Sequence, residues 1–286
     1  MNHGAHWLFV RASLAGPRGW RASFFSRAQL ALHRVRVLAT SGRQKRRFRA
    51  MASRQLVRNS FRIVAVKPVL ADPDLLSMDS LIELLADRLL SGEVVALATD
   101  TVFGLVGCAA NCRALTAIAR IKGRDPSIAM PVLIGERSQL DLLVPSPISS
   151  DENVAKLIDA YWPGPLTIVL PLRSGAVCES FFPGGRIGVR LPDDLRLQTL
   201  VSRTGPVVAT SANKHGKPTL RSGSEVMAEL VSEEGSPGLA VVVNEGSRSG
   251  IASTIVEVNA AGFRVIREGG ISGEAVGRVF GVGLQQ

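Results

Sequence analysis

Short apolar runs alternate with segments of helical periodicity along this chain from about residue 60 onward. Runs rich in Val, Ile and Leu, bounded by Gly, Pro, Asp or Ser, are typical of buried β-strands. On this pattern we predict strands at residues 61–66, 94–99, 130–134, 166–172, 186–191, 207–210, 239–243, 253–258 and 263–267.

Helices are predicted where a capping pair precedes an amphipathic pattern. In a capping box, a Ser and a Glu three residues later satisfy the free N–H groups of the first helical turn. Such pairs occur at Ser80/Glu83, Ser149/Glu152 and Ser222/Glu225. Gly92 is expected to end the first of these helices and Pro163-Gly164-Pro165 the second. Two further helices are predicted at residues 111–121 and 273–280.

The order of these elements indicates the fold class. The later strands follow one another without long helices between them, which favours a mixed sheet over an all-parallel one. No internal repeat is visible, and no linker after residue 72 separates two domains. We therefore expect one α/β domain, spanning residues 59–286.

Composition supports a packed domain without a membrane span. Hydrophobic residues make up 46% of the 286 positions, and the mean hydropathy is +0.20. No apolar run approaches the roughly 18 to 20 residues that a transmembrane helix needs. We expect the protein not to cross a membrane.

The net charge of +10 is concentrated at one end of the chain. Residues 1–71 contain thirteen Arg and two Lys but no acid, so they carry +15 and the remainder carries −5. Residues 1–58, rich in Arg, Ser and Ala, are typical of a mitochondrial or plastid transit peptide. The alternative is a retained basic arm that contacts RNA phosphates. Met51 could serve as an internal start that yields a cytoplasmic form.

Cysteine and histidine usage excludes several classes of site. Cys108, Cys112 and Cys178 match neither a disulfide framework nor a zinc spacing, and we expect buried free thiols. His215 is the single histidine outside the basic arm. A catalytic triad or a multi-histidine metal centre is therefore nearly excluded, and no metal ligand is assigned.

Polar residues gather where predicted strands end, which is where α/β sheets place their ligand sites. The chain has no P-loop, no G-x-G-x-x-G turn and no G-x-S-x-G elbow. Taken singly, such residues are more often turn, cap and helix-dipole partners than ligands. Together they supply cations, hydroxyls and small residues suited to a polyanion beside a small polar molecule. The four segments are residues 98–105, 122–124, 208–213, and 253–254 with 267–269.

These segments, in this order, resemble the Sua5/YrdC family, the threonylcarbamoyl-AMP synthases. The resemblance runs from about Val69 to Gly269. Its most specific blocks are Asp100-Thr101-Val102-Phe103-Gly104-Leu105, Lys122-Gly123-Arg124, Trp162-Pro163-Gly164-Pro165-Leu166-Thr167, Gly188-Val189-Arg190-Leu191-Pro192, Ala209-Thr210-Ser211-Ala212-Asn213 with Gly216 and Pro218, Ser253-Thr254-Ile255, and Arg267 with Gly269.

The resemblance implies an open, twisted, mixed α/β sheet with flanking helices around a deep concave cavity. It implies an L-threonylcarbamoyladenylate synthase, a nucleotidyltransferase that condenses L-threonine with bicarbonate and adenylates the carbamate with ATP, releasing pyrophosphate. Mg²⁺ would accompany the ATP. A separate transferase would then carry the threonylcarbamoyl group to adenosine 37 of tRNA. Because the chain ends soon after the matched blocks, it is expected to be the short, YrdC-type form.

Two sets of site residues follow from the match to the family motifs. The first would bind ATP, with cations on the phosphates and polar side chains orienting the nucleotide: Lys122, Arg124, Arg267, Ser211, Asn213 and Thr219. The second would bind threonine, with Arg190 on its carboxylate: Arg190, Thr101, Ser253 and the backbone of Ala209. A fork-shaped guanidinium suits a bidentate carboxylate contact.

The chain departs from the family pattern at three places. Asp100 and Phe103 stand where the family usually has Glu and Tyr. The spacing from Arg124 to Pro131 is about two residues longer than usual, so no ligand contact is assigned within 125–130. His215 occupies a position that is commonly small, and a solvent-facing turn is favoured over a general base.

Two other functions fit part of the pattern. A double-stranded RNA-binding or ribosome-maturation protein could use a concave groove, although the −5 charge of residues 72–286 weakens this reading. A carbamoyl-adenylate-forming module, as in hydrogenase-maturation carbamoyltransferases, would need zinc-finger and acylphosphatase regions that this sequence lacks.

Overall fold

The computed structural model describes residues 68–146, 151–232, 235–236, 238–245, 251–259 and 262–280. The chain divides into two units, Met1–Ile63 and Val64–Gln286, and every described residue lies in the second. The predicted leader at 1–58 and the predicted strand at 61–66 lie outside the described residues, so the domain boundary at 58/59 stays a prediction. None of the helices within the described ranges has the length and apolarity to cross a membrane.

Strands and helices interleave along the described part of the chain. The strands are β1 (Val69–Ala71), β2 (Val94–Ala98), β3 (Phe103–Cys108), β4 (Val132–Leu133), β5 (Leu166–Pro171), β6 (Arg186–Arg190), β7 (Val207–Ser211), β8 (Leu239–Val243), β9 (Thr254–Asn259) and β10 (Gly262–Arg267). The α-helices are α3 (Met78–Leu90), α4 (Cys112–Lys122), α5 (Leu140–Leu143), α7 (Glu152–Tyr161), α8 (Leu195–Thr204), α9 (Gly223–Leu230) and α10 (Gly273–Val279). Short 3-10 turns are η1 (Pro73–Leu75), η2 (Arg137–Gln139), η3 (Glu179–Phe181) and η4 (Pro183–Gly185).

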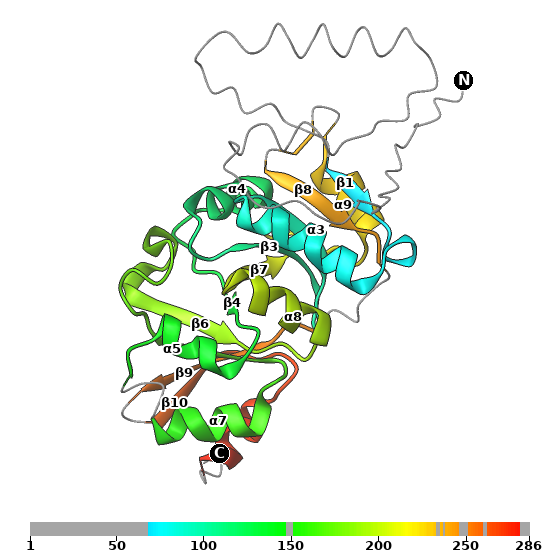
Figure 1. The fold of residues 1–286 in the computed structure, drawn as a ribbon. Helices are drawn as coiled ribbons and strands as arrows, with labels where there is room; N and C mark the ends of the chain where they lie inside the picture. Colours follow the sequence, from blue (N-terminus) through cyan, green and yellow to red (C-terminus); the bar gives the residue numbers. More distant parts are fainter. Residues whose placement is uncertain are drawn as a thin grey trace, which may run out of the picture. The chain divides into compact units, whose positions relative to one another are not determined.

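These strands form one mixed sheet in the order β1-β8-β2-β3-β7-β4-β6-β5-β9-β10 (Figure 1). Strand β8 is parallel to β1 and β2, β4 is parallel to β6, and β5 is parallel to β9. The remaining neighbours are antiparallel. The predicted mixed α/β class is confirmed, whereas the predicted deep cavity stays a prediction.

Helices cover both faces of the sheet, because side chains along a strand alternate between faces. In β2, Val94 and Ala96 belong to the core cluster that α4, α7 and α9 cover, while Val95 and Leu97 belong to the cluster beneath α3 and α8. Figure 1 shows α3 and α8 together over β3 and β7. Central strands buried on both faces explain why the sequence reads there as continuous apolar runs.

Capping chemistry sets the ends of α4, the helix that leads into the Lys122 segment. The Asn111 side chain accepts hydrogen bonds from the backbone N–H groups of Arg113 and Ala114. At the other end Gly123 adopts a left-handed conformation with φ of 60°, which glycine tolerates without steric cost. Lys122 and Arg124 therefore flank a fixed turn.

Several sequence predictions need correction. Ser77, not Ser80, caps α3, because its hydroxyl accepts the Ser80 N–H. Asp151 caps α7, accepting from the N–H groups of Asn153 and Val154, and the predicted cap Ser149 lies outside the described residues. Ser222 caps α9 as predicted, accepting from the Glu225 N–H.

Strand β1 and two central elements were not predicted at all. Strand β3 contains two glycines, which weaken a strand pattern. A Cβ at Gly107 would lie 3.1 Å from the Ala114 Cβ, so a side chain there would crowd α4. Helix α8 carries an inward apolar stripe and is capped by Asp194, whose side chain accepts from the Leu197 N–H.

The cysteine prediction was wrong for two of the three residues. Cys112 and Cys178, 66 positions apart, form a disulfide with Cα atoms 5.2 Å apart. The fold brings the start of α4 next to η3, a proximity that the spacing of the cysteines does not encode. Cys108 is free and buried, as expected.

Candidate functional site

A rigid turn between β2 and β3 presents Asp100 and Thr101. The buried Thr99 hydroxyl donates to the Val102 carbonyl at 2.7 Å and accepts from the Val102 N–H at 3.1 Å. It also accepts from the Thr101 N–H at 3.2 Å. One threonine side chain thus organises the turn at the point where strand pairing ends.

Arg190, the last residue of β6, forms a buried ion pair with Asp100. Its Nη1 lies 2.8 Å from Asp100 Oδ1 and 2.7 Å from Oδ2, and the two side chains are 5% and 9% exposed. The Asp193 backbone N–H donates to Asp100 Oδ2 at 3.0 Å. Arg190 Nη2 lies 3.5 Å from the Thr101 hydroxyl oxygen. Buried charges need such pairing, because desolvation is expensive.

A second group of contacts joins β5, β9 and β10. The Thr167 and Ser253 hydroxyl oxygens are 2.9 Å apart, and both side chains are buried. Arg267 Nη2 donates to the Ser253 carbonyl at 2.7 Å, and burial lowers the pKa of its guanidinium. Ile168 pairs with Val189 across β5 and β6, so Thr167 lies next to Arg190. The Ser253 and Arg190 groups are therefore neighbours.

Gly269 permits this close approach. A Cβ there would lie 2.6 Å from the Ser253 carbonyl carbon and 2.7 Å from the Thr254 nitrogen. Thr254 Oγ1 accepts from the N–H groups of Gly269 at 2.9 Å and of Ile271 at 3.0 Å. The absence of a side chain lets the segment after β10 pack onto the start of β9 and keeps Arg267 against Ser253.

The third group surrounds Lys122 at the C-terminal end of α4. Lys122 Nζ donates to the Ser211 carbonyl, to the Asn213 carbonyl at 3.1 Å and to Asn213 Oδ1 at 2.9 Å. The Ser211 hydroxyl donates to the same Asn213 Oδ1 at 2.7 Å. Burial, and then the charge of Arg124, lowers the pKa of Lys122 to about 8. The ammonium therefore fixes the segment that follows β7.

Arg124, next to this group, has one donor that is not satisfied within the protein. Its Nη2 donates to the carbonyls of Ile128 and Ala129, each at 2.6 Å. Its Nε is buried without a hydrogen-bond partner, and burial lowers the pKa of the guanidinium. A buried donor without an acceptor is costly, and an oxyanion would satisfy it.

Pairing between β3 and β7 brings these groups to the Asp100–Thr101 turn. Gly104 pairs with Ser211, and the Ala212 N–H donates to the Phe103 carbonyl at 2.8 Å. The Leu220 N–H donates to the Ala212 carbonyl at 3.0 Å, which places Thr219 beside the same segment. The turn consequently lies between the Arg190 ion pair and the Lys122 group.

Comparison with known proteins identifies the family. A family model described as "Telomere recombination" (Sua5/YciO/YrdC) matches residues 87–269. The chain belongs to this family.

Similar proteins include named enzymes. The chain is 34% identical over 200 residues to "Threonylcarbamoyl-AMP synthase" of Bacillus subtilis, covering 68% of this chain and 55% of that protein. A structure of Pyrococcus abyssi Sua5 complexed with L-threonine matches with a TM-score of 0.66 and 26% identity, covering 76% of this chain and 61% of that one. The structure of Escherichia coli YciO shares the fold, with a TM-score of 0.61 at 19% identity and coverage of 73% and 98%.

Most of the residues expected from the Sua5/YrdC motifs fall into the three groups just described. Thr101 and Arg190 lie together, Ser253 lies with Arg267, and Lys122 holds both Ser211 and Asn213. Ala209 pairs with Val106 in β3 and donates its N–H to the Pro131 carbonyl at 3.0 Å. For Thr219, the evidence for its position beside this segment is the backbone hydrogen bond of the next residue, Leu220, to Ala212. His215 is exposed, and its N–H donates to the Lys122 carbonyl at 2.8 Å.

The family motifs did not indicate every residue that shapes the site. Arg196 and Glu245 hold the end of β2 from both sides: Arg196 Nη2 donates to the Ala98 carbonyl at 3.0 Å, and Glu245 Oε1 accepts from the Ala98 N–H at 2.7 Å. An ion pair of 2.5 Å joins the two side chains. They are 49 positions apart, and no local pattern links them.

A hollow of about 510 Å³ lies elsewhere, between the outer side of α4 and the end of α9. It contains none of the ten predicted site residues. Its lining comprises Arg120, Ile121, Lys214, Ala228, Glu229, Leu230, Val231, Ser232, Gly235 and Ser236.

Proposed function

We propose that this protein is an L-threonylcarbamoyladenylate synthase that supplies the threonylcarbamoyl modification of tRNA. The observation that carries the proposal is that a group suited to a carboxylate and a group suited to phosphates lie on either side of the Asp100–Thr101 turn. A buried guanidinium, Arg190, faces Thr101 on one side, and the cation-bearing Lys122 segment flanks the other. The named B. subtilis relative and the threonine-bound P. abyssi Sua5 support this reading.

Threonine would lie at the Arg190 group. Nη1 of Arg190 is taken by Asp100, so the substrate carboxylate would bind the Nη2 edge beside Thr101. Ser253, held by Thr167, would contact the amino or hydroxyl group. The amine, once deprotonated, attacks bicarbonate carbon, and water leaves as the carbamate forms.

ATP would lie along the Lys122 group. Lys122, Arg124 and Arg267 would neutralise the phosphates, while Ser211, Asn213 and Thr219 would orient the nucleotide. A carbamate oxygen then attacks the α-phosphorus, the bond to the β-phosphate oxygen breaks, and pyrophosphate leaves. Positioning and charge neutralisation can drive such a transfer without a protein nucleophile.

Mg²⁺ would enter with ATP. Among the described residues, no group of three or more His, Cys, Asp or Glu side chains could hold a metal ion. Mg²⁺ is commonly held by substrate phosphates and water with few protein ligands. Mg²⁺ would therefore arrive as part of the Mg-ATP substrate.

The proposal is tested by pyrophosphate release from the full-length chain. With Mg-ATP, release is expected when threonine and bicarbonate are both present, and to fall to background when either is omitted. Serine in place of threonine tests recognition of the side-chain methyl. Pyrophosphate release at the same rate with and without threonine and bicarbonate would overturn the proposal.

The affinity for Mg-ATP is expected to fall as the pH rises through about 8. The Lys122 ammonium carries its charge below its pKa of about 8 and loses it above. Binding should weaken roughly two- to tenfold between about pH 7 and pH 9. Isothermal titration calorimetry of Mg-ATP binding without threonine measures this pH dependence, because no substrate amino group then titrates in the same range. The Lys122→Met variant should lack the dependence, and an equal dependence in that variant would assign it to another group.

A further inference from the structure

The Cys112–Cys178 disulfide joins two residues that are not part of the proposed site. Cys112 is the first residue of α4 and is exposed, whereas Cys178 is 5% exposed and lies in the hydrophobic core beside η3. The bond crosses from the start of α4 to the connection between β5 and β6. The residue at one end of the bond is therefore exposed and the residue at the other end is buried.

We propose that this pair is a reversible thiol–disulfide site, reduced from solvent through Cys112 by a dithiol reductant. Exchange requires a thiolate to reach one sulfur of the bond. The exposed Cys112 offers that access, and the burial of Cys178 directs attack to a single sulfur. The proposal is independent of the synthase activity.

The exchange balances as a two-electron reduction. A reductant thiolate attacks Cys112 Sγ, the Cys112–Cys178 bond breaks, and Cys178 leaves as a thiolate that takes up a proton. Ser180 Oγ lies 3.4 Å from Cys178 Sγ and can donate to the leaving sulfur. The second thiol of the reductant then attacks its own mixed-disulfide sulfur and releases Cys112. The protein gains two electrons and two protons, and the reductant becomes a disulfide.

The position of Cys112 favours its release. It is the first residue of an 11-residue helix, where the helix dipole stabilises a thiolate. A sulfur whose thiolate is stabilised is a better leaving group in exchange. The same position makes Cys112 the reactive thiol of the reduced protein.

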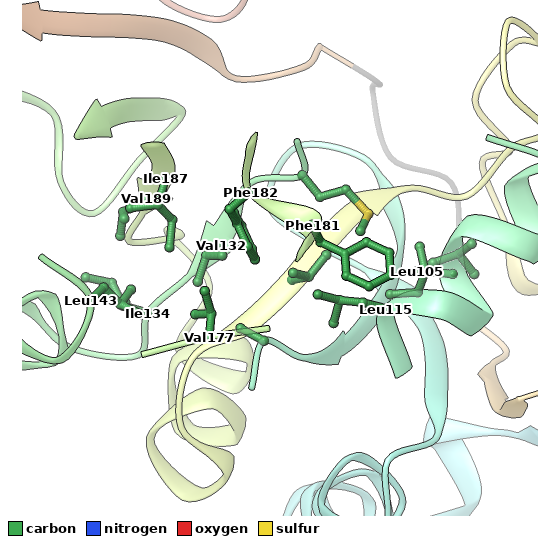
Figure 2. Close-up of a cluster of buried hydrophobic side chains, with 14 of the residues drawn as sticks. Leu105, Leu115, Val132, Ile134, Leu143, Val177, Phe181, Phe182, Ile187 and Val189 are labelled. Atoms are coloured by element: carbon green, nitrogen blue, oxygen red, sulfur yellow. The ribbon is translucent and has the colours of Figure 1, made fainter. Parts of the chain in front are cut away.

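Other contacts hold the two segments together after reduction. The Cys178 N–H donates to the Ala109 carbonyl at 3.0 Å. Phe181 and Phe182 are 5% and 2% exposed, and Figure 2 shows Phe181 against Leu115 of α4. The reduced protein should therefore stay folded, with lower thermal stability because its unfolded chain is no longer cross-linked.

Cys108 supplies a matched control. The sequence contains three cysteines, and Cys108 is the remaining one. It belongs to the core cluster on the opposite face of the sheet from Cys178, and burial raises the pKa of its thiol. It should neither exchange with the pair nor react readily.

The test uses the full-length chain purified without reductant. Peptide mapping should find Cys112 bonded to Cys178, and native dithiothreitol should make Cys112 alkylatable while lowering the melting temperature by roughly 5 to 15 °C. Cys112→Ser should melt like the reduced wild type and ignore dithiothreitol, whereas Cys108→Ser should respond as the wild type does. Reduction only after denaturation, a missing bond, or an equal thermal response in Cys112→Ser would overturn the proposal.

Discussion

Replacing Lys122 with methionine is expected to lower the rate of pyrophosphate release by about 100-fold or more. Methionine replaces the aliphatic part of the side chain but removes the charge and all three hydrogen bonds to Ser211 and Asn213. Loss of one preorganised donor near developing charge commonly costs about 100- to 1,000-fold. The change removes positive charge from the proposed phosphate site and also releases the segment that would orient ATP.

The neighbouring Lys214 provides the control for this experiment. Lys214 Nζ donates to the Ile121 carbonyl at 2.7 Å, but the residue is exposed and lies outside the proposed site. Lys214→Met should keep activity within about threefold, since it loses a single neutral-acceptor hydrogen bond. Rates and melting curves of both variants decide the outcome. A folded Lys122→Met variant with near wild-type rate would remove Lys122 from the mechanism.

Replacing Arg190 with methionine is expected to damage both stability and threonine recognition. The change leaves the Asp100 carboxylate buried without its cation, which typically costs about 3 to 5 kcal/mol of unfolding free energy. Loss of a charge-assisted carboxylate contact should also raise the KM for threonine roughly 100-fold. Denaturant unfolding and initial rates at varied threonine measure the two effects.

A double variant separates these effects. Arg190→Met with Asp100→Asn removes the orphan charge, so much of the lost stability should return while threonine recognition stays impaired. Arg186, on the same strand, pairs with Glu257 and is about one-third exposed, so Arg186→Met should change the KM little. Recovery of threonine affinity in the double variant would show that Arg190 does not bind the substrate carboxylate.

The residue pattern along the sequence was sufficient to predict most of the central strands and several helix ends. Apolar runs located β2, β5, β6 and β8 closely, because strands buried on both faces have little choice of residue type. Strand β3 was missed because it contains two glycines, of which Gly107 leaves room for α4, and the approach of that helix is a tertiary contact. The caps at Ser77 and Asp151 show that several nearby residues can satisfy the same N–H groups.

The family motifs named residues that lie near one another in the structure, but they did not reveal how these residues pair. The family motifs grouped Lys122, Ser211 and Asn213, and hydrogen bonds from the Lys122 ammonium and the Ser211 hydroxyl link these residues in the structure. The Asp100–Arg190 ion pair spans 90 positions, and only the folded sheet brings the two residues together. The disulfide was missed for the same reason.

The most direct measurement of the central claim follows the carbon of bicarbonate into the product. The full-length chain is incubated with threonine, Mg-ATP and carbon-13-labelled bicarbonate, and the products are analysed by mass spectrometry. The account predicts an adenylate that contains threonine and one labelled carbon, formed in step with pyrophosphate. Consumption of ATP without any labelled threonine adenylate would contradict it.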